Sequence, residues 1–167
     1  MRRLLGTVVL LAAVVGSNVA FGADSADTSG VGLFDAQIVL TPDEGLFRTL
    51  WRATGETAIT STNHVTREGA ITALLLLRGC APDARQLCDV VAEFSVETMD
   101  GQIVSRASGS ARWHAPPPQE PVNLADGSAP IHFDAAAPLG QYRVVAVVTD
   151  RVSGRRFMAT RWLKLIA

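Results

Sequence analysis

The two cysteines, Cys80 and Cys88, are the residues whose type and spacing most directly suggest chemistry. Redox-active thiol pairs are usually separated by two residues, and structural zinc needs four ligands at tighter spacings. Seven residues lie between these thiols, so neither chemistry fits. Paired cysteines of exported proteins are usually bridged. We therefore predict a structural disulfide that closes a short loop between two hydrophobic runs, Ile71–Arg78 and Val90–Val96, as a stapled hairpin.

The other residues with catalytic potential do not fall into a motif. His64, His114 and His132 lie far apart and match no metal-binding spacing. The single lysine, Lys164, has Arg161 three residues before it, which excludes a Ser-x-x-Lys nucleophile. The carboxylates stand mainly in turns, where bonding to the backbone explains them: Asp43, Glu44, Asp83, Asp89, Asp100, Asp126, Asp134 and Asp150. We predict no catalytic residue, metal site or cofactor; a hydrolase whose active site assembles only in three dimensions is an alternative.

Three tryptophans, Trp51, Trp113 and Trp162, are candidates for contact with a ligand. Exposed together, they could form an aromatic platform for a sugar. Packing in the hydrophobic core is the competing interpretation, because large aromatic side chains dominate small β cores. The sequence leaves both interpretations open.

The N-terminus has the three-part layout of a secretory signal peptide. Met1–Arg3 is positively charged, Leu4–Val15 is apolar or small, and Ala20–Gly22 offers a small-x-small cleavage site. The apolar run is shorter than the roughly 20 residues that a membrane-spanning helix needs. We predict that residues 1–22 are a signal peptide and that the mature protein is periplasmic or secreted, without a stable membrane span.

The remainder is long enough for one domain. Residues 23–32 are polar and small, which predicts a disordered lead-in over residues 23–34, and residues 35–167 form the domain. Loss of Arg2 and Arg3 leaves 13 basic against 16 acidic residues, a formal net charge of −3. Because that overall balance does not attract polyanions, we expect no nucleic-acid partner.

One good helix start lies at residues 41–44. Thr41 can cap a helix, Pro42 suits its first position, and Glu44 completes a capping box. Apolar side chains then recur at helical spacing, Glu44 and Arg48 form an i,i+4 pair, and Gly55 stands where a helix would stop. A turn followed by a strand is the alternative, since the surrounding sequence favours β structure. The local pattern favours a short helix over residues 42–54.

Strand patterns flank the cysteines. Ile71–Arg78 is apolar on both faces, which predicts a strand in the middle of a sheet. Val90–Val96 alternates between apolar and polar residues, as in a strand with one solvated face. Asp100 and Gly101 indicate a turn, and Ile103–Arg106 continues into a further strand.

The C-terminal half also has short strands separated by turns. Pro116–Pro118, with Pro121 close behind, predicts an extended connector that crosses between sheets or over the surface. Ile131–Phe133 is a short strand, Gln141–Thr149 the strongest strand, and Arg156–Ile166 the last one, after a hairpin connection at residues 150–154. Six to eight short strands predict a mainly β fold, a single antiparallel β-sandwich.

Several of these segments together resemble a family of small exported bacterial proteins with an immunoglobulin-like sandwich and no assigned activity. The matching residues are Arg67-Glu68-Gly69, Gly79-Cys80, Cys88-Asp89-Val90, Met99-Asp100-Gly101, Trp113, Pro138-Leu139-Gly140-Gln141-Tyr142, Asp150 and Ser153-Gly154. They span about residues 47–167. The resemblance implies a fold and a compartment, and it transfers no catalytic residue.

The predicted function is that of an exported, non-catalytic module that binds a protein or a cell-envelope component. A carbohydrate-binding or small-ligand-binding protein is the alternative. A partner strand could add to an exposed sheet edge at Gln141–Thr149 or Arg156–Ile166. The loop between the cysteines, which carries Asp83 and Arg85, is the preferred contact surface.

The disulfide can be tested by titrating free thiols under denaturing, non-reducing conditions. We expect essentially none in exported material, because the bridged loop stabilises the fold by about 2.5 kcal/mol. Reduced and denatured protein is the control and should yield both thiols. Two free thiols per chain without reductant would contradict the bridge.

Overall fold

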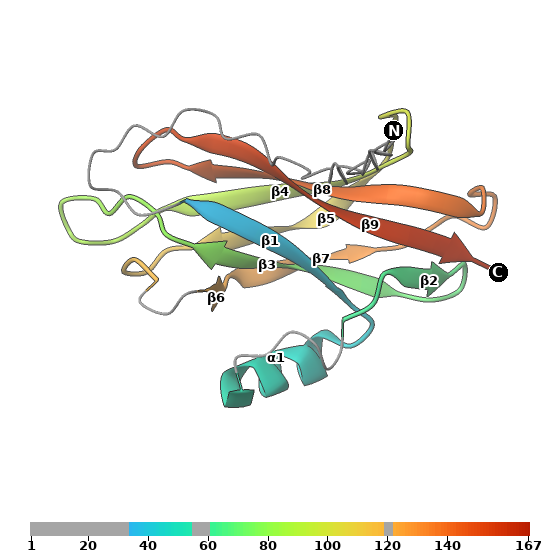
Figure 1. The fold of residues 1–167 in the computed structure, drawn as a ribbon, viewed down its shortest axis with the longest axis horizontal. Coiled ribbons are helices and arrows are strands. Elements are labelled where there is room, and N and C mark those ends of the chain that lie inside the picture. Colours follow the sequence, from blue (N-terminus) through green and yellow to red (C-terminus); the bar gives the residue numbers. More distant parts are fainter. Residues whose placement is uncertain (1–33, 55–60, 119–121) are drawn as a thin grey trace, which may run out of the picture.

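The computed structural model describes residues 34–54, 61–118 and 122–167. The elements in these ranges are β1 (Asp35–Thr41), α1 (Glu44–Thr54), β2 (His64–Thr66), β3 (Ile71–Arg78), β4 (Val90–Glu97), β5 (Ile103–Trp113), β6 (Asn123–Leu124), β7 (Asp126–Ile131), β8 (Gly140–Asp150) and β9 (Arg156–Ile166). Figure 1 shows the strands in two facing layers with α1 on one outer side. The prediction of a mainly β sandwich with one short helix is confirmed. The predicted signal peptide, Gly55 and Pro121 lie outside the described residues, as does the predicted lead-in apart from Phe34.

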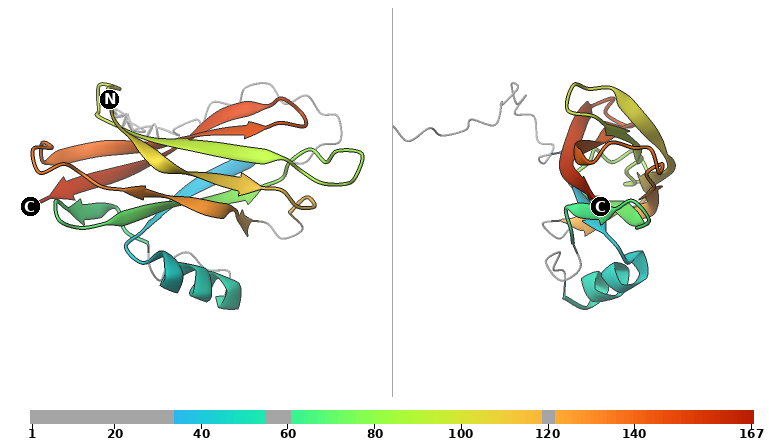
Figure 2. Two further views of the ribbon diagram at one scale, coloured as in Figure 1. Left: turned by 180° about the vertical axis from the view of Figure 1, so that it is seen from behind. Right: turned by 90° about the vertical axis from the view of Figure 1, so that its right-hand side faces the viewer.

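The two sheets share one strand. The first sheet contains β1, β3, β6 and β7, and the second runs β5, β4, β8, β9 and β2. Ala129–Ile131 of β7 pair with β3, whereas Asp126–Ser128 pair with β5. Gly127 has a φ of +80°, and a Cβ atom there would lie 2.3 Å from the carbonyl oxygen of Ser110. Glycine permits this close approach, and β7 thereby closes one side of the sandwich, as the end-on view in Figure 2 shows.

The core lies between the two sheets and takes alternate side chains from each strand. From the second sheet these are Val90, Ala92, Phe94 and Val96 of β4 and Tyr142, Val144, Ala146 and Val148 of β8. This confirms the alternation predicted for β4, and β8 alternates in the same way. The Tyr142 hydroxyl donates to the carbonyl oxygen of Pro138 at 2.6 Å, while its ring lies 4.8 Å from that of Phe133. The polar end of a buried tyrosine is thus satisfied without interrupting the apolar core.

β3 is buried on both faces, as its sequence predicts. Leu75 and Leu77 point into the sandwich core, whereas Leu74 and Leu76 form a second cluster with Phe47 of α1. Complete burial of a side chain such as Phe47 contributes about 1.5–3 kcal/mol. The helix therefore serves as a cover for the outer face of the first sheet (Figure 1).

The helix begins two residues later than predicted, and Asp43 caps it instead of Thr41. The Asp43 Oδ1 atom accepts from the Leu46 N–H at 2.9 Å. Thr41 is the last residue of β1, is completely buried and pairs with Thr72, so its backbone belongs to the strand. Its hydroxyl instead accepts from the Asp43 N–H at 3.2 Å. The predicted capping box is therefore wrong, although the helix itself is confirmed.

The predicted pair of Glu44 and Arg48 forms and also ties the helix to β7. Arg48 Nε donates to Glu44 Oε1 at 2.8 Å, and Arg48 Nη2 donates to the carbonyl oxygen of Gly127 at 2.7 Å. The Ser128 hydroxyl donates to the other carboxylate oxygen of Glu44 at 2.8 Å. Burial raises the pKa of Glu44, but the hydrogen bonds from Arg48 and Ser128 and the charge of Arg48 outweigh it and hold the pKa below its ordinary value.

The cysteines form the predicted disulfide, with Cα atoms 6.0 Å apart, but they do not staple a hairpin. β3 pairs with β1, β6 and β7, whereas β4 pairs with β5 and β8. The loop between Cys80 and Cys88 therefore crosses from one sheet to the other. A strand that is apolar on both faces, such as β3, needs neighbours along both edges, and these come from elsewhere in the chain.

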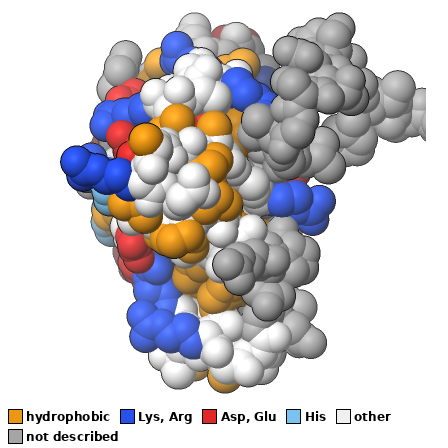
Figure 3. Space-filling model, turned by 90° about the vertical axis from the view of Figure 1, so that its left-hand side faces the viewer, with side chains coloured by type: hydrophobic (Ala, Val, Ile, Leu, Met, Phe, Trp, Pro, Cys, Tyr) orange, Lys and Arg blue, Asp and Glu red, His pale blue; other side chains and the backbone are white. Residues whose placement is uncertain are grey.

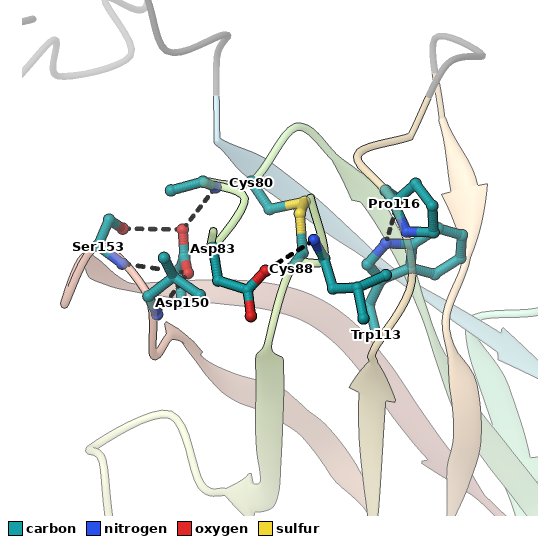
Figure 4. Close-up of a disulfide and its surroundings, with 10 residues drawn as sticks. Cys80, Asp83, Cys88, Trp113, Pro116, Asp150 and Ser153 are labelled. Atoms are coloured by element: carbon teal, nitrogen blue, oxygen red, sulfur yellow. Dashed lines mark hydrogen bonds between the residues drawn. A yellow bond between two sulfur atoms is a disulfide. The ribbon is translucent and has the colours of Figure 1, made fainter. Parts of the chain in front are cut away.

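A buried carboxylate holds this crossing loop to the neighbouring β8–β9 turn (Figure 4). Asp150 is only 1% exposed. It accepts from the N–H of Ala81 at 2.9 Å, from that of Val152 at 3.0 Å and from the hydroxyl of Ser153 at 2.8 Å. The turn itself closes as predicted, with Gly154 N–H donating to the Asp150 carbonyl at 2.8 Å.

The stretch between β5 and β8 agrees only in part with the sequence prediction. Pro116–Pro118 follow β5 of the second sheet and precede β6, which pairs with β3 of the first, so the chain does cross between sheets here. The strand predicted at Ile131–Phe133 is wrong, because β7 ends at Ile131. Pro130 and Gly127, which usually indicate breaks, lie inside β7 because this strand changes sheets midway.

Replacement of Asp150 should destabilise the disulfide end. In Asp150→Ala the N–H groups of Ala81 and Val152 and the hydroxyl of Ser153 lose their acceptor, which we expect to lower the free energy of unfolding by about 3 kcal/mol. Urea denaturation with the disulfide intact measures this change. Asp89→Ala is the matched control, since its 3.8 Å ion pair with Arg151 is exposed and should contribute less than about 1 kcal/mol. Equal losses in the two variants would contradict the role assigned to Asp150.

Glu44 should make part of the free energy of unfolding sensitive to acid. Its pKa is lower in the folded chain than in the unfolded chain, so the unfolded chain takes up the proton first as pH falls. The stabilisation is present above the ordinary value of 4.5 and is lost as the pH falls through the lower folded value. Glu44→Gln should therefore show a shallower loss of stability between about pH 5 and pH 3 than the wild type. Asp134→Asn, at an exposed carboxylate away from the helix, is the control; a Glu44→Gln profile parallel to the wild type would refute the coupling.

Candidate binding surface

The outer faces of the two sheets differ. α1 covers the outer face of the first sheet, where Phe47 packs on Leu74 and Leu76. No helix in the described part of the chain covers the outer face of the second sheet (Figures 1 and 2). We call the outward side chains of β4, β8 and β9 the open face. They are Val91, Glu93, Ser95, Glu97, Gln141, Arg143, Val145, Val147, Thr149, Arg156, Met158, Thr160, Trp162 and Lys164.

Strand register arranges the open face in rows across the sheet. Glu93 lies beside Val147, which lies beside Met158. A second row crosses the sheet four residues after Met158. It contains Glu97 of β4, Arg143 of β8 and Trp162 of β9. The rows follow from pleating, since the intervening residues point into the core.

Large apolar side chains stand exposed on this face and at its rim. Met158 is 70% exposed, Trp162 54% and Ile103, at the start of β5, 52%. A shallow hollow of about 450 Å³ has Ile103 and Met158 in its wall, together with Glu93 and Val147. Exposed apolar side chains beside a hollow are typical of an interaction site.

The charges on the open face are unevenly distributed. Glu97 and Arg143 neutralise each other in an ion pair of 2.9 Å. Arg143 Nε is buried and has no hydrogen-bond partner among the described residues. Residues 151–167, which include β9, contain five basic and no acidic residues. β9 therefore gives one border of the face a positive charge.

The structure does not bring the three predicted tryptophans together. The Trp51 ring stacks on Phe47 with centroids 6.1 Å apart. Trp113 donates through Nε1 to the Pro116 carbonyl at 3.1 Å and pairs with Val90 at the start of β4. Trp162 belongs to the row at the opposite end of β4. A three-tryptophan platform is therefore not formed, and of the three only Trp162 lies on the open face.

The loop residues Asp83 and Arg85 have different roles. Asp83 Oδ1 accepts from the N–H groups of Arg85 at 2.8 Å and Leu87 at 3.0 Å, so this carboxylate orders the loop. The hydrogen bond from Leu87 is the main reason that the pKa of Asp83 lies below its ordinary value. Arg85 is exposed. Figure 3 looks onto this end of the molecule, where basic and acidic side chains lie beside a patch of apolar ones. Arg85 remains a predicted contact residue.

The histidines are not assembled into one site. His64 lies in β2 beside the Thr62 hydroxyl, and His114 follows β5. His132 and Asp134 line a separate hollow of about 300 Å³, with Tyr142 in its wall, but no hydrogen bond joins these two exposed side chains. Among the residues that the structure describes, no group of three His, Cys, Asp or Glu side chains could hold a metal ion.

Neither of the two suggested edge strands is a fully open edge of the sheet. β8, which contains Gln141–Thr149, pairs with β4 on one side and with β9 on the other, so it is interior. β9 pairs with β8, and its second edge pairs with β2 only at Lys164–Ile166. β1 lies alongside the rest of that edge.

Sequence reasoning missed Met158 and Ile103 as candidate contact residues. A signal for Met158 was present in the alternation of β9. Ala159, Leu163 and Leu165 lie on one face of the strand, and Met158 and Trp162 lie on the other. Two apolar side chains at solvent positions of a strand are not needed for the core. No comparable signal marks Ile103 as exposed.

Comparisons with known proteins found distant structural similarities. No protein-family model matches the chain, and no curated protein matches it. A family 123 glycoside hydrolase from Clostridium perfringens is 11% identical, with a TM-score of 0.41, over 80% of this chain and 27% of the hydrolase. The chain thus spans about a quarter of that protein's length. An immunoglobulin-like protein from Pseudomonas aeruginosa is 12% identical, with a TM-score of 0.33, over 79% of this chain and 92% of that protein. No helix in the described ranges is both long and apolar enough to cross a membrane.

Proposed function

We propose that this chain is an exported, non-catalytic sandwich module that binds a protein or cell-envelope component through the open face. The observation that carries the proposal is the exposure of Met158 and Trp162, at 70% and 54%, on a sheet face that no helix of the described residues covers. On the other sheet, by contrast, α1 covers the apolar outer side chains of β3.

The composition of the open face supports a binding role. Tryptophan, methionine and arginine are enriched in the centres of protein interfaces, where they provide contact area and directed hydrogen bonds. The Arg143–Glu97 pair lies in the same row as Trp162, so charged groups stand beside the exposed indole.

The disulfide supports the proposal of an exported protein. Disulfides persist in oxidising compartments such as the periplasm and the extracellular space. Cys80 and Cys88 are both buried, so the bridge is a structural part of the sandwich.

Replacement of the exposed apolar pair should weaken partner capture. In the double variant Met158→Ser and Trp162→Ser we expect at least about a tenfold loss of affinity, because each buried side chain contributes about 1.5–3 kcal/mol. The measurement is a quantitative pull-down, after cross-linking, from an envelope extract of the source cells.

Leu46→Ser and Leu139→Ser form the matched control, since these leucines are 48% and 50% exposed but lie outside the open face. Thermal unfolding establishes that both double variants fold. Capture of the same partner by the wild type and both variants alike would disprove the assignment of the open face. Trp162 fluorescence that responds to a glycan panel, without any protein captured, would favour the carbohydrate alternative.

A further inference from the structure

We propose that the partner presents an extended acidic segment, which runs along β9 with carboxylates on Arg156 and Lys164 and apolar side chains on Met158 and Trp162. This inference rests on the proposed function, because it identifies the chemistry of what the open face binds. It depends on the outward side chains along the length of β9, which we call the β9 stripe: Arg156, Met158, Thr160, Trp162 and Lys164.

The order of side chains in the β9 stripe defines what can lie on it. Every member is exposed. A basic residue stands at each end, the two large apolar residues lie inside these, and Thr160 is in the middle. At about 3.3 Å per residue, Arg156 and Lys164 are roughly 26 Å apart. An extended chain of the same length matches this spacing, because its alternate side chains also share one face.

The charge around the stripe favours carboxylates. Besides Arg156 and Lys164, residues 151–167 contain Arg155, Arg161 and Arg151, of which Arg151 is paired with Asp89 at 3.8 Å, and they contain no acidic residue. Glu97 is already paired with Arg143. Glu93 is in the row of Met158 but two strands away, roughly 10 Å. An anionic partner is therefore attracted most strongly to β9.

The shape of the face favours a peptide segment over a lipid surface. The basic residues follow one strand, and the hollow beside Met158 can receive a partner side chain. A flat anionic membrane would also press on Glu93 and Glu97, which stand on the same face, and would bring lipid phosphates against their carboxylates. A single extended segment avoids them by following β9.

Two synthetic peptides test the inference directly. The first is Glu-Ser-Leu-Ser-Thr-Ser-Phe-Ser-Glu, which places carboxylates and apolar side chains in the order of the β9 stripe. The second has lysine in place of both glutamates. Fluorescence anisotropy with the purified chain should show the first peptide binding at least about tenfold more tightly, with an affinity that falls as salt is added. Equal binding of the two peptides, or no binding up to about 1 mM, would overturn the inference.

Charge reversal supplies the matched protein variants. Arg156→Glu with Lys164→Glu should lower affinity for the first peptide at least about tenfold and should favour the lysine peptide. Arg52→Glu, at an exposed arginine of α1, should leave both affinities unchanged. Vesicles containing phosphatidylglycerol form a third arm. Binding to vesicles but not to the first peptide would replace the acidic segment with a lipid surface and refute this inference.

The two proposals fail in different ways. Suppose that Met158→Ser with Trp162→Ser abolishes partner capture but Arg156→Glu with Lys164→Glu does not. The open face then binds its partner, and the proposal of an acidic segment is wrong. If neither double variant affects capture, both proposals are wrong.

Discussion

The requirement that β3 be covered on both faces determines much of this molecule. Its inward side chains, such as Leu75 and Leu77, are satisfied by the opposite sheet. Leu74 and Leu76 would remain in water if the domain were only a sandwich. The chain inserts α1 between β1 and β2, and the Phe47 side chain covers this second apolar surface. One side of the sandwich is thereby closed by its own sequence, and the opposite side is left as the available surface.

A second constraint operates at the disulfide end. The loop from β3 to β4 has to cross between sheets, so it cannot be held by ladder hydrogen bonds along its length. The Cys80–Cys88 bond closes this loop, and Asp150 binds it to the β8–β9 turn through the Ala81 N–H. The buried carboxylate is tolerated because backbone and hydroxyl donors surround it. The disulfide therefore secures the contact of two sheets instead of two neighbouring strands.

The elements were predictable from sequence to the extent that local patterns determine them. The alternation of β4 and β8, the two-sided β3 and the helix are all visible in the order of residues. Pairing was not, because neighbours such as β3 and β7 are far apart in the chain and any apolar strand could adjoin β3. The β7 strand was misplaced because Gly127 and Pro130 have the local chemistry of a break but lie where one strand serves two sheets. The helix cap was predicted wrongly for a similar reason, since Thr41 belongs to β1 and its backbone pairs with β3.

The open face illustrates a different limit on what folding explains. Other outward positions of β8 and β9 carry residues that suit water, such as Gln141, Thr149 and Thr160, and the outward valines Val145 and Val147 are buried or only partly exposed. Polar side chains at positions 158 and 162 would leave the core intact, because the alternation of side chains along β9 points these two positions away from it. Methionine and tryptophan at these positions lower the solubility of the isolated domain without filling any internal space. The fold thus accounts for where these side chains point and does not account for what they are. That difference is the physical basis for assigning the open face to a partner and not to the stability of the chain.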